Sequence, residues 1–465
     1  MEITGKISYS SRRADTAKVS WFCDILSDRI IRSRLNSLHL SYGTGEKTKF
    51  SDRKLNIYIP RKQRSFDEMS LVFDKISQGT PWIKADDSII EADIDLISFA
   101  LWILNREEET LQCDNSDCWD REGRFLLCKS LAYRKGQWKR PVLDLLLVQL
   151  IKVMEEKIGF PLLRRKPWGE RGEMAVWATH DVDRLMIKYG LLLKLPVWLF
   201  FAAKQLVRGN KENGRYWLRK CFRNLKSRED SIYESIQKLA ELEKEHRLKS
   251  TYFFMGLRRG ISWGERLRYP ISHPKAKNLL RHLVGDGNEI GLHPGRYKPF
   301  DKGHLINQQR NLEHALGKTV NVLRNHHLLV HYPDSWKMAE ACGVSVCSNV
   351  GWRSGNGFRA GTCWPYHPFD IHADRQLNIL ENPMIYMDNA NDAESEIVRE
   401  VLSLANEVSL VHGVLTINFH THIFETFDLS SKGAAYKDLL EGLKKYNFLN
   451  TEDIVGNLWN VNNAC

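Results

Sequence analysis

VWATHDVDRL, residues 176–185, is the stretch from which the fold of this chain can be worked out. A short apolar run leads directly into one histidine and two carboxylates. If the run is a buried strand, its side chains alternate between two faces, so Asp181 and Asp183 point one way and His180 points the other. Two carboxylates this close need a compensating cation, which predicts one metal ligand and one general base. The competing interpretation is that an aspartate only caps the next helix.

Four later stretches repeat this pattern of charged or imidazole groups beside apolar runs. They are GNEIGLHPG (287–295), RNHHLL (324–329), GFRAGTCWPYHPFD (357–370) and LTINFHTHIF (415–424). Helical patterns separate the strands, which number roughly seven, including one expected at 378–388. Active sites of βα barrels are assembled in this way at the carboxyl ends of the strands. The recurrence therefore predicts an α/β barrel with its site at the strand ends.

In this order the five motifs resemble the polysaccharide deacetylase-like family, the NodB-homology or carbohydrate esterase family 4 type. The likeness is to a bacterial branch that writes the first motif as THDVD and the second as GLHP, and that carries an extra N-terminal domain. It covers nearly the whole chain. The resemblance implies a distorted (β/α)7 barrel preceded by a smaller α/β domain. It also implies a divalent-metal hydrolase that removes an acetyl or formyl group from a sugar of a polysaccharide or of a lipid-linked glycan precursor.

The resemblance assigns roles by position. Asp181 matches the catalytic base, Asp183 and His293 match metal ligands, Arg324 matches the arginine that orients the base, and His420 matches the general acid. Better-studied members have a second metal histidine shortly after the first, but here PGRYK (294–298) follows His293. We hypothesise that His326, beside Arg324, supplies the third ligand.

The residue types predict hydrolysis at a divalent ion, for which histidine ligands favour zinc. Asp181 would take a proton from the attacking water and His420 would protonate the departing amine or alkoxide. Arg324 would aim Asp181 through a bidentate contact. A backbone N–H near Trp352 would help to hold the oxyanion.

Further residues are candidates for contacts with the substrate. Trp364 and Tyr366 form either a sugar-stacking platform or an aromatic core turn. His422 shares a strand face with His420 and is interpreted as a backup acid or a substrate contact. His180, on the opposite face, is expected to be a hydrogen-bonded core residue.

Composition bounds the class of protein and its partners. The chain has 465 residues, of which 43% are hydrophobic, enough for two or three globular domains. Lys and Arg number 68 against 57 Asp and Glu, and this excess of eleven favours anionic partners such as phospholipid surfaces, lipid-linked sugars or acidic glycans. The basic residues are scattered and no zinc-finger or RNP-type pattern occurs, so no nucleic-acid partner is expected.

Cysteine usage and the N-terminus bear on location. The nine cysteines are odd in number and include no CxxC pair, which is typical of free thiols in a reducing compartment. MEITGKISYSSRRAD lacks the apolar core of a secretory signal. A cytoplasmic location is expected, with the alternative of peripheral contact with the inner membrane face.

The strand LNIYIP (55–60) and helical patterns at 94–104 and 142–158 predict a small α/β domain over residues 1–165. The boundary is placed in the basic linker 164–173, so the barrel domain covers 166–465. The resemblance implies that the first part is an accessory domain.

Residues 189–211 form an apolar insertion directly after the first motif. A lysine and a proline interrupt it, so a membrane-spanning helix is not expected. Two interpretations remain open. The insertion is either an apolar helix covering the barrel or a helix in a membrane interface, with Trp198, Phe200 and Phe201 embedded and its basic residues facing anionic headgroups.

Two other function classes stay open. A noncatalytic glycan- or lipid-binding module would keep the barrel without the metal, and the missing second-motif histidine favours it. A metal-dependent amidohydrolase acting on small non-sugar amides, including cyclic ones, would use a similar barrel. Metal content separates the first class from the enzyme, and a substrate panel separates the second.

Overall fold

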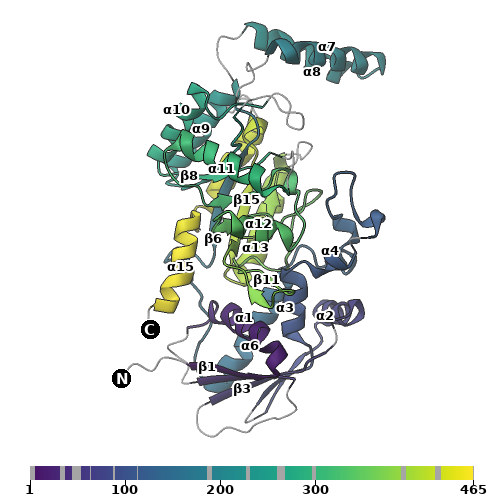
Figure 1. The fold of residues 1–465 in the computed structure, drawn as a ribbon, viewed down its shortest axis with the longest axis vertical. Coiled ribbons are helices and arrows are strands. Elements are labelled where there is room, and N and C mark those ends of the chain that lie inside the picture. The colour runs from purple at the N-terminus through teal and green to yellow at the C-terminus, as the bar shows by residue number, and fades with distance from the viewer. Residues whose placement is uncertain are drawn as a thin grey trace.

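The computed structural model contains two main sheets, one in the N-terminal part of the chain and one in the C-terminal part, each with its own helices (Figure 1). The structure describes residues 6–31, 37–43, 54–62, 64–86, 89–112, 114–185, 191–226, 231–258, 268–295, 300–388, 394–424 and 431–463.

The first sheet has five strands in the order β1-β2-β3-β5-β4. They are β1 (Lys6–Ser11), β2 (Ser37–Tyr42), β3 (Lys54–Ile59), β4 (Ile83–Ala85) and β5 (Ile90–Ala92). Every pair is parallel except β4 with β5. Leu55, Ile57 and Ile59 of β3 share one face and are buried, because alternate residues of a strand face the same side. The smaller α/β unit is therefore confirmed.

The helices of this part are α1 (Thr16–Ser27), α2 (Phe66–Gln78), α3 (Leu96–Leu104), α4 (Glu107–Leu111), α5 (Leu131–Arg134) and α6 (Val142–Ile158). Their ends follow from local sequence. Ser65 begins α2 by accepting a hydrogen bond from Glu68 N, and α6 ends at Gly159, whose φ of 79° is cheap for a residue without Cβ. Helix α3 is buried at every position, because its sequence is apolar all round.

The second sheet is parallel and curled, in the order β13-β10-β9-β8-β7-β6-β15-β14, with β16 also pairing with β6. Its strands are β6 (Ala175–Val182), β7 (Thr251–Phe254), β8 (Glu289–Leu292), β9 (Val322–Leu323), β10 (Val346–Cys347), β13 (Leu380–Glu381), β14 (Tyr386–Met387), β15 (Val414–Asn418) and β16 (Asn447–Phe448). Strands β6, β7 and β15 are buried throughout, as expected where both faces of a parallel sheet are covered.

One segment joins the two edges of this sheet. The single strand expected at 378–388 is two short strands, and β13 pairs with β10 while β14 pairs with β15. Between them Met384 N donates to Val350 O and Ile385 N donates to Thr416 O, so the segment bends from one edge to the other. Taken as one kinked strand, it completes a seven-stranded arrangement with β6 to β10 and β15. This confirms the expected distorted (β/α)7 barrel.

The helices of the second part are α7 (Leu191–Val207), α8 (Lys211–Lys226), α9 (Ser231–Glu245), α10 (Pro274–Gly285), α11 (Lys302–Leu316), α12 (Asp334–Ala341), α13 (Glu394–Leu410), α14 (Ser431–Leu443) and α15 (Thr451–Asn463). A small antiparallel pair, β11 (Phe369–Asp370) with β12 (Arg375–Gln376), lies outside the barrel sheet. Within the described part of the chain, none of the helices combines the length and apolar character needed to cross a bilayer.

Buried ion pairs join the two parts of the chain. In α4, Glu109 receives two hydrogen bonds from Arg359, at 3.0 Å from Nε and 2.7 Å from Nη2, and both side chains are 4% exposed. Arg106 donates to the same carboxylate at 2.9 Å. Arg164 still contacts the N-terminal part, where its backbone N donates to Arg29 O, and Trp168 donates to His412 O in the barrel part. The proposed boundary at 165/166 lies between these two residues.

Replacing Arg359 by alanine is expected to lower the free energy of unfolding by about 3–5 kcal/mol, because Glu109 would keep a buried charge that has lost its main partner. Denaturant unfolding of Arg359→Ala against wild type measures this. The matched control is Arg375→Ala, which removes an equally bidentate contact, to Glu340, from a side chain that is 49% exposed. There the loss should stay within about 1 kcal/mol, since water and salt screen the pair. Equal losses at both sites would contradict the buried joint.

Candidate metal centre and active site

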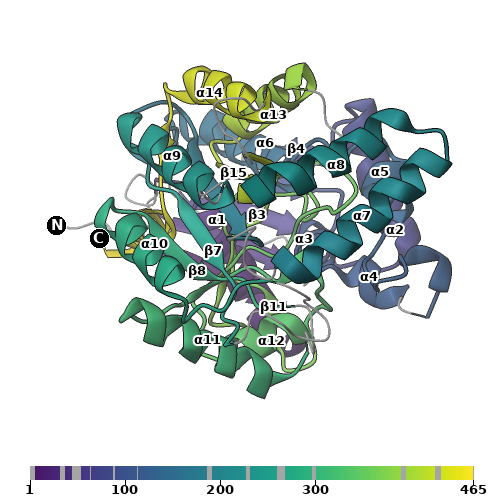
Figure 2. The same ribbon diagram turned by 90° about the horizontal axis from the view of Figure 1, so that it is seen from above.

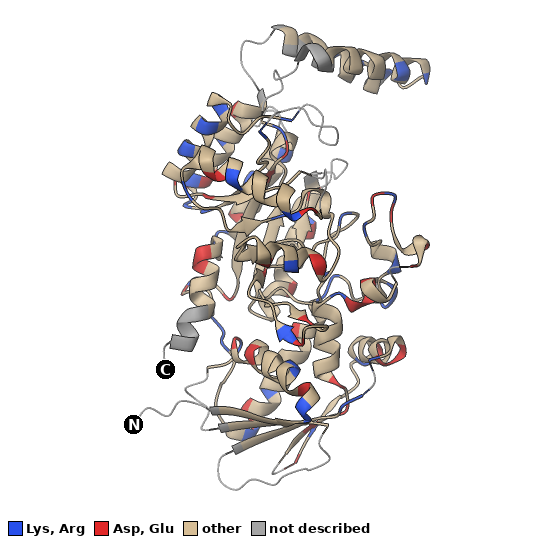
Figure 3. Ribbon diagram, viewed as in Figure 1, with Lys and Arg blue, Asp and Glu red and all other residues tan. Residues whose placement is uncertain are grey.

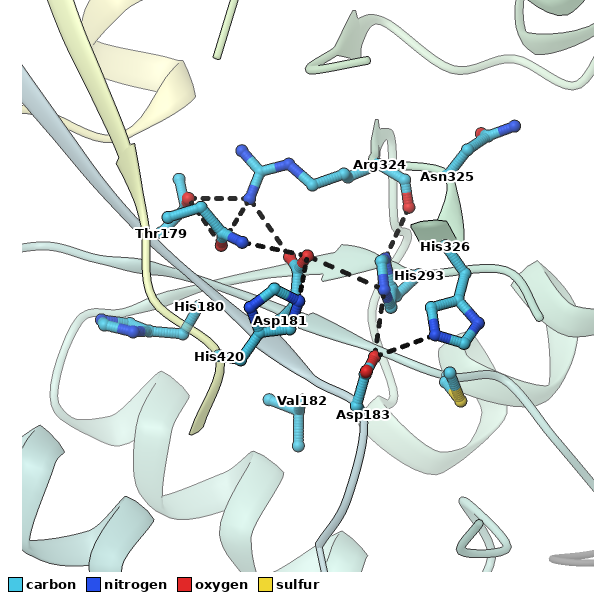
Figure 4. Close-up of polar contacts among 12 residues, drawn as sticks. Thr179, His180, Asp181, Val182, Asp183, His293, Arg324, Asn325, His326 and His420 are labelled. Atoms are coloured by element: carbon cyan, nitrogen blue, oxygen red, sulfur yellow. Dashed lines mark hydrogen bonds and ion pairs between the residues drawn. The ribbon is translucent and has the colours of Figure 1, made fainter. Parts of the chain in front are cut away.

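The carboxyl ends of neighbouring parallel strands bring the polar groups of the motifs together (Figure 4). Strand β6 carries Asp181 near its end and is followed by Asp183. Strand β8 leads to His293, β9 leads to Arg324 and His326, and β15 leads to His420. Parallel strands expose their carboxyl ends at the same rim, which is why residues far apart in sequence converge.

Asp183, His293 and His326 form a compact set of potential metal ligands. Asp183 Oδ1 lies 3.3 Å from His293 Nε2 and 3.3 Å from His326 Nε2. The three ligand atoms all lie within 4.8 Å of one another, and the three residues are buried. His326 reaches the set from a 3-10 turn, His326–Leu328, in which the next residue, His327, has a left-handed φ of 61°. A turn rather than strand alternation therefore places His326.

The hydrogen bonds around this set fit a cation. His293 Nδ1 lies 2.7 Å from Arg324 O, so Nδ1 carries a proton, and the Nε2 of a neutral ring would present its lone pair to Asp183. His293 Nε2 and Asp183 Oδ1 are both buried and have no hydrogen-bond partner. Leaving two buried polar atoms unpaired is costly, and a divalent ion would satisfy both. The donor set of two imidazoles and one carboxylate is one that zinc accepts.

Arg268 borders the metal-ligand set and was not identified from the sequence. Its Nη1 donates to Asp183 O at 3.2 Å, and its Nη2 lies 3.5 Å from His326 Nε2. A cation held by His326 would repel this guanidinium, so loading the site requires Arg268 to turn away.

Burial and charge act in opposite directions on the carboxylate of Asp183. Burial raises its pKa, but the facing imidazole of His326 outweighs this and holds the pKa well below its usual range. The carboxylate is ionised at neutral pH, as a metal ligand must be.

Asp181 is held by two donors. Arg324 Nη1 donates to Oδ1 at 3.1 Å and Asn418 Nδ2 donates to Oδ2 at 3.1 Å. The expected bidentate contact from Arg324 is wrong, because its Nε and Nη2 donate to Ser348 instead. Burial raises the pKa of Asp181, but His293 and Arg324 outweigh it, so the pKa lies below its ordinary value.

His420 faces Asp181 from the other side. Its Nε2 lies 3.8 Å from Asp181 Oδ2, and its Nδ1 lies 2.8 Å from Asp388 Oδ1. Burial lowers the pKa of His420, but Asp388 and then Asp181 outweigh it and raise the pKa to about 9. His420 is therefore protonated at neutral pH, which a general acid requires.

His422 lies beside His420, with ring centroids 5.4 Å apart. Burial, and then the positive charge of His420, lower its pKa to about 3. It is thus neutral where His420 is charged, and its buried Nδ1 has no hydrogen-bond partner.

His180 lies on the other face of β6, as alternation predicted. It is fully buried, its Nδ1 lies 3.0 Å from Phe419 O, and its Nε2 lies 2.8 Å from Glu243. The carboxylate of Glu243 also accepts from Tyr252 and Tyr436. This buried network supports the strand from behind.

The aromatic residues proposed for substrate contacts lie in the core. Trp364 is 0% exposed and donates to Val411 O, and Tyr366 is 3% exposed and donates to Leu104 O. The expected sugar-stacking platform is therefore wrong, and Trp364 and Tyr366 form the alternative, an aromatic turn in the core. Trp352 is also buried, packed with Phe125 and Leu127 of the N-terminal part rather than against a substrate. Apolar packing, which motif spacing does not reveal, decides these three positions.

Sequence reasoning missed Asn418 and Asp388 at the site. Asn418 stands two residues before His420, so the alternation that relates His420 to His422 could have found it. Asp388 follows Tyr386–Met387 of β14, and its role depends on that short strand lying beside β15. Only the pairing of the strands reveals it.

Residues 4–159 match a family of unknown function, DUF7033. A search of curated proteins finds no match. The matched segment covers the five-stranded sheet and helices α1 to α6. Whether the chain is part of the THDVD/GLHP branch stays a prediction.

Among solved structures, the chain is similar to a protein from Mycobacterium smegmatis assigned as a polysaccharide deacetylase, with 13% identity over 64% of this chain and 93% of that one, at a TM-score of 0.42. It is also similar to an allantoinase, with 12% identity, coverage of 63% and 93% and a TM-score of 0.40. A pseudoenzyme of the CE4 family from Bacillus anthracis gives 13% identity, coverage of 62% and 67% and a TM-score of 0.31. At scores below 0.5, these likenesses carry no argument about activity.

Proposed function

We propose that this protein is a metal-dependent hydrolase that removes an acetyl or formyl group from a sugar of a polysaccharide or a lipid-linked glycan precursor. The observation that carries the proposal is the pair of buried, unpartnered ligand atoms, Asp183 Oδ1 and His293 Nε2, 3.3 Å apart. An ionised carboxylate and a protonated imidazole stand beside them. A ligand set, a base and an acid together match the requirements of metal-assisted hydrolysis.

Asp183, His293 and His326 would hold the ion, for which this donor set favours zinc. When bound, a divalent ion polarises a carbonyl oxygen and lowers the pKa of a water.

The residues of the chain supply the proton transfers. Asp181 Oδ2 accepts the proton of the attacking water, while Asn418 and Arg324 fix the orientation of the carboxylate. His420 then gives the proton on Nε2 to the departing amine or alkoxide, and Asp388 keeps the ring aimed by accepting from Nδ1.

One observation favours the noncatalytic alternative. The guanidinium of Arg268 lies 3.5 Å from His326 Nε2, the nitrogen that faces Asp183, and so brings a positive charge to the edge of the ligand set. A binding module without metal would keep Arg268 in this position permanently.

We place the reaction in the cytoplasm, on precursors rather than on finished polymers, and expect no nucleic-acid partner. The odd number of cysteines and the lack of a CxxC pair support a reducing compartment.

A panel of substrates tests the proposal. Acetate release from chitooligosaccharides and from lipid-linked amino sugars, and formate release from formylated sugars and from simple formamides, are measured with purified protein, after chelation and after reloading with zinc. We expect hydrolysis of the sugar substrates only, loss on chelation and recovery on reloading. Faster turnover of the simple formamides would identify a small-amide hydrolase instead. Protein that binds no zinc and hydrolyses nothing would identify the binding module.

A further inference from the structure

Helices α7 and α8 form an antiparallel hairpin that projects from the barrel part of the molecule (Figures 1 and 2). The turn between them, 208–210, contains Gly209 with a φ of 78°. The hairpin begins eight residues after Asp183, so it is attached to the end of β6 that carries the candidate base and a candidate ligand.

Small residues form the contact between the two helices. Ala202 of α7 and Gly214 of α8 are buried, and a Cβ on Gly214 would approach Leu206 to 2.5 Å. Phe201 stacks on Trp217 with ring centroids 5.4 Å apart. The hairpin is thus held by its own packing, and this seam occupies one side of α7.

The other side of α7 is largely apolar and faces outward, and exposed Lys204 lies among its apolar side chains by the same helical spacing. Val197, Phe200 and Val207 are 47%, 63% and 88% exposed, and their spacing of three and seven residues puts them on one side of the helix. Eight of the fifteen large hydrophobic side chains that are exposed in the described residues belong to the hairpin. Such a concentration marks an interaction surface rather than the scattered apolar residues of an ordinary protein surface.

The same hairpin is strongly basic. Residues 191–226 contain nine Lys and Arg and one Glu. The exposed ones among the described side chains are Lys204, Arg208, Lys211, Arg215 and Arg219. Figure 3 shows blue positions toward the free end of a largely tan hairpin. An apolar face flanked by cations complements one surface in particular, the interface of an anionic bilayer, where acyl chains lie beneath negative headgroups.

We propose that the α7–α8 hairpin docks the protein on anionic lipid bilayers, with Val197, Phe200 and Val207 inserted below the headgroups. Docking brings the end of β6, and with it the candidate active site, close to the lipid surface. The interpretation of 189–211 as a helix covering the barrel does not fit these exposed residues. Of the three residues expected to be embedded, only Phe200 is kept. Trp198 is partly buried against the main core, and Phe201 packs on Trp217. Lys188, one of the basic residues expected to face anionic headgroups, lies outside the described residues.

Vesicle flotation tests the docking with the full-length protein. Wild type is expected to float with mixed phosphatidylglycerol–phosphatidylcholine vesicles at low salt, much less at high salt, and not with pure phosphatidylcholine. Phe200→Ser/Val207→Ser should weaken the binding at least about tenfold, because two apolar side chains no longer leave water. The matched control, Leu71→Ser/Leu410→Ser, replaces two apolar residues of α2 and α13 that are 52% and 58% exposed, and it should float like wild type.

Three results would overturn the proposal: no flotation of wild type at low salt, equal binding of the Phe200→Ser/Val207→Ser variant, or equal binding to neutral vesicles. Dimers that form without vesicles and dissociate in that variant would assign the face to a second copy of the chain instead. The docking does not rest on the proposed hydrolase activity. Asp181→Asn, which should lower turnover by about a hundredfold or more, is expected to float like wild type, so failure of either proposal is recognised separately.

Discussion

We expect each of two variants, Asp183→Ala and His293→Ala, to weaken zinc binding more than about a hundredfold. Loss of a residue that only supports a ligand already weakens metal binding by up to about a hundredfold, and these variants remove a ligand itself. Each variant removes one of the two buried atoms that face each other at 3.3 Å without a hydrogen-bond partner. Wild type should carry about one ion per chain, the ratio for a single set of three ligands. Elemental analysis of purified protein and titration of chelated protein with zinc provide the measurements.

The third ligand can be identified with a matched pair of neighbours. His326 and His327 are adjacent, and their rings lie 4.0 Å apart between centroids, yet only His326 belongs to the ligand set. His326→Ala should lose zinc affinity, whereas His327→Ala should keep it. Should His327→Ala be the variant that loses the ion, the assignment of the third ligand is wrong.

Asp181→Asn is expected to retain zinc and to lower turnover by about a hundredfold or more, because the amide cannot accept the proton of water. The amide still offers one oxygen to Arg324 or Asn418, so the fold should be kept. His420→Ala should lose a similar factor, since it removes the proton donor. Single-turnover rates together with the zinc content of each variant separate chemistry from binding. An Asp181→Asn enzyme with most of its activity would rule out this base.

The pH profile tests His420 as the acid. Its protonated form is present below its folded pKa of about 9 and is lost as the pH rises through that value, so turnover should fall on the alkaline side. Asp388→Asn removes the main charge that raises this pKa and should move the alkaline limb to lower pH. A bound cation lowers the pKa in both proteins, so the difference between them is the readout. If His422→Gln moves the limb and Asp388→Asn does not, His420 is not the acid.

The sequence by itself determined the parts of the site that depend on short-range geometry. Alternation along one strand separated Asp181 and Asp183 from His180, and the structure places them on opposite faces of β6. The apolar patterns located β3, α3 and α6, the last with its end at Gly159. These features follow from the two-residue period of a strand and the 3.6-residue period of a helix, which are fixed by the backbone alone.

Only the tertiary structure decided which distant groups meet. It added Asn418 and Asp388, gave most donors of Arg324 to partners other than Asp181, and placed Arg268 beside His326. It also buried Trp364 and left Phe200 exposed, although both read as apolar sequence. Pairing of β14 with β15 and the packing of whole elements set these outcomes. Such contacts depend on the positions of residues far apart in the chain, and local periodicity carries no information about them.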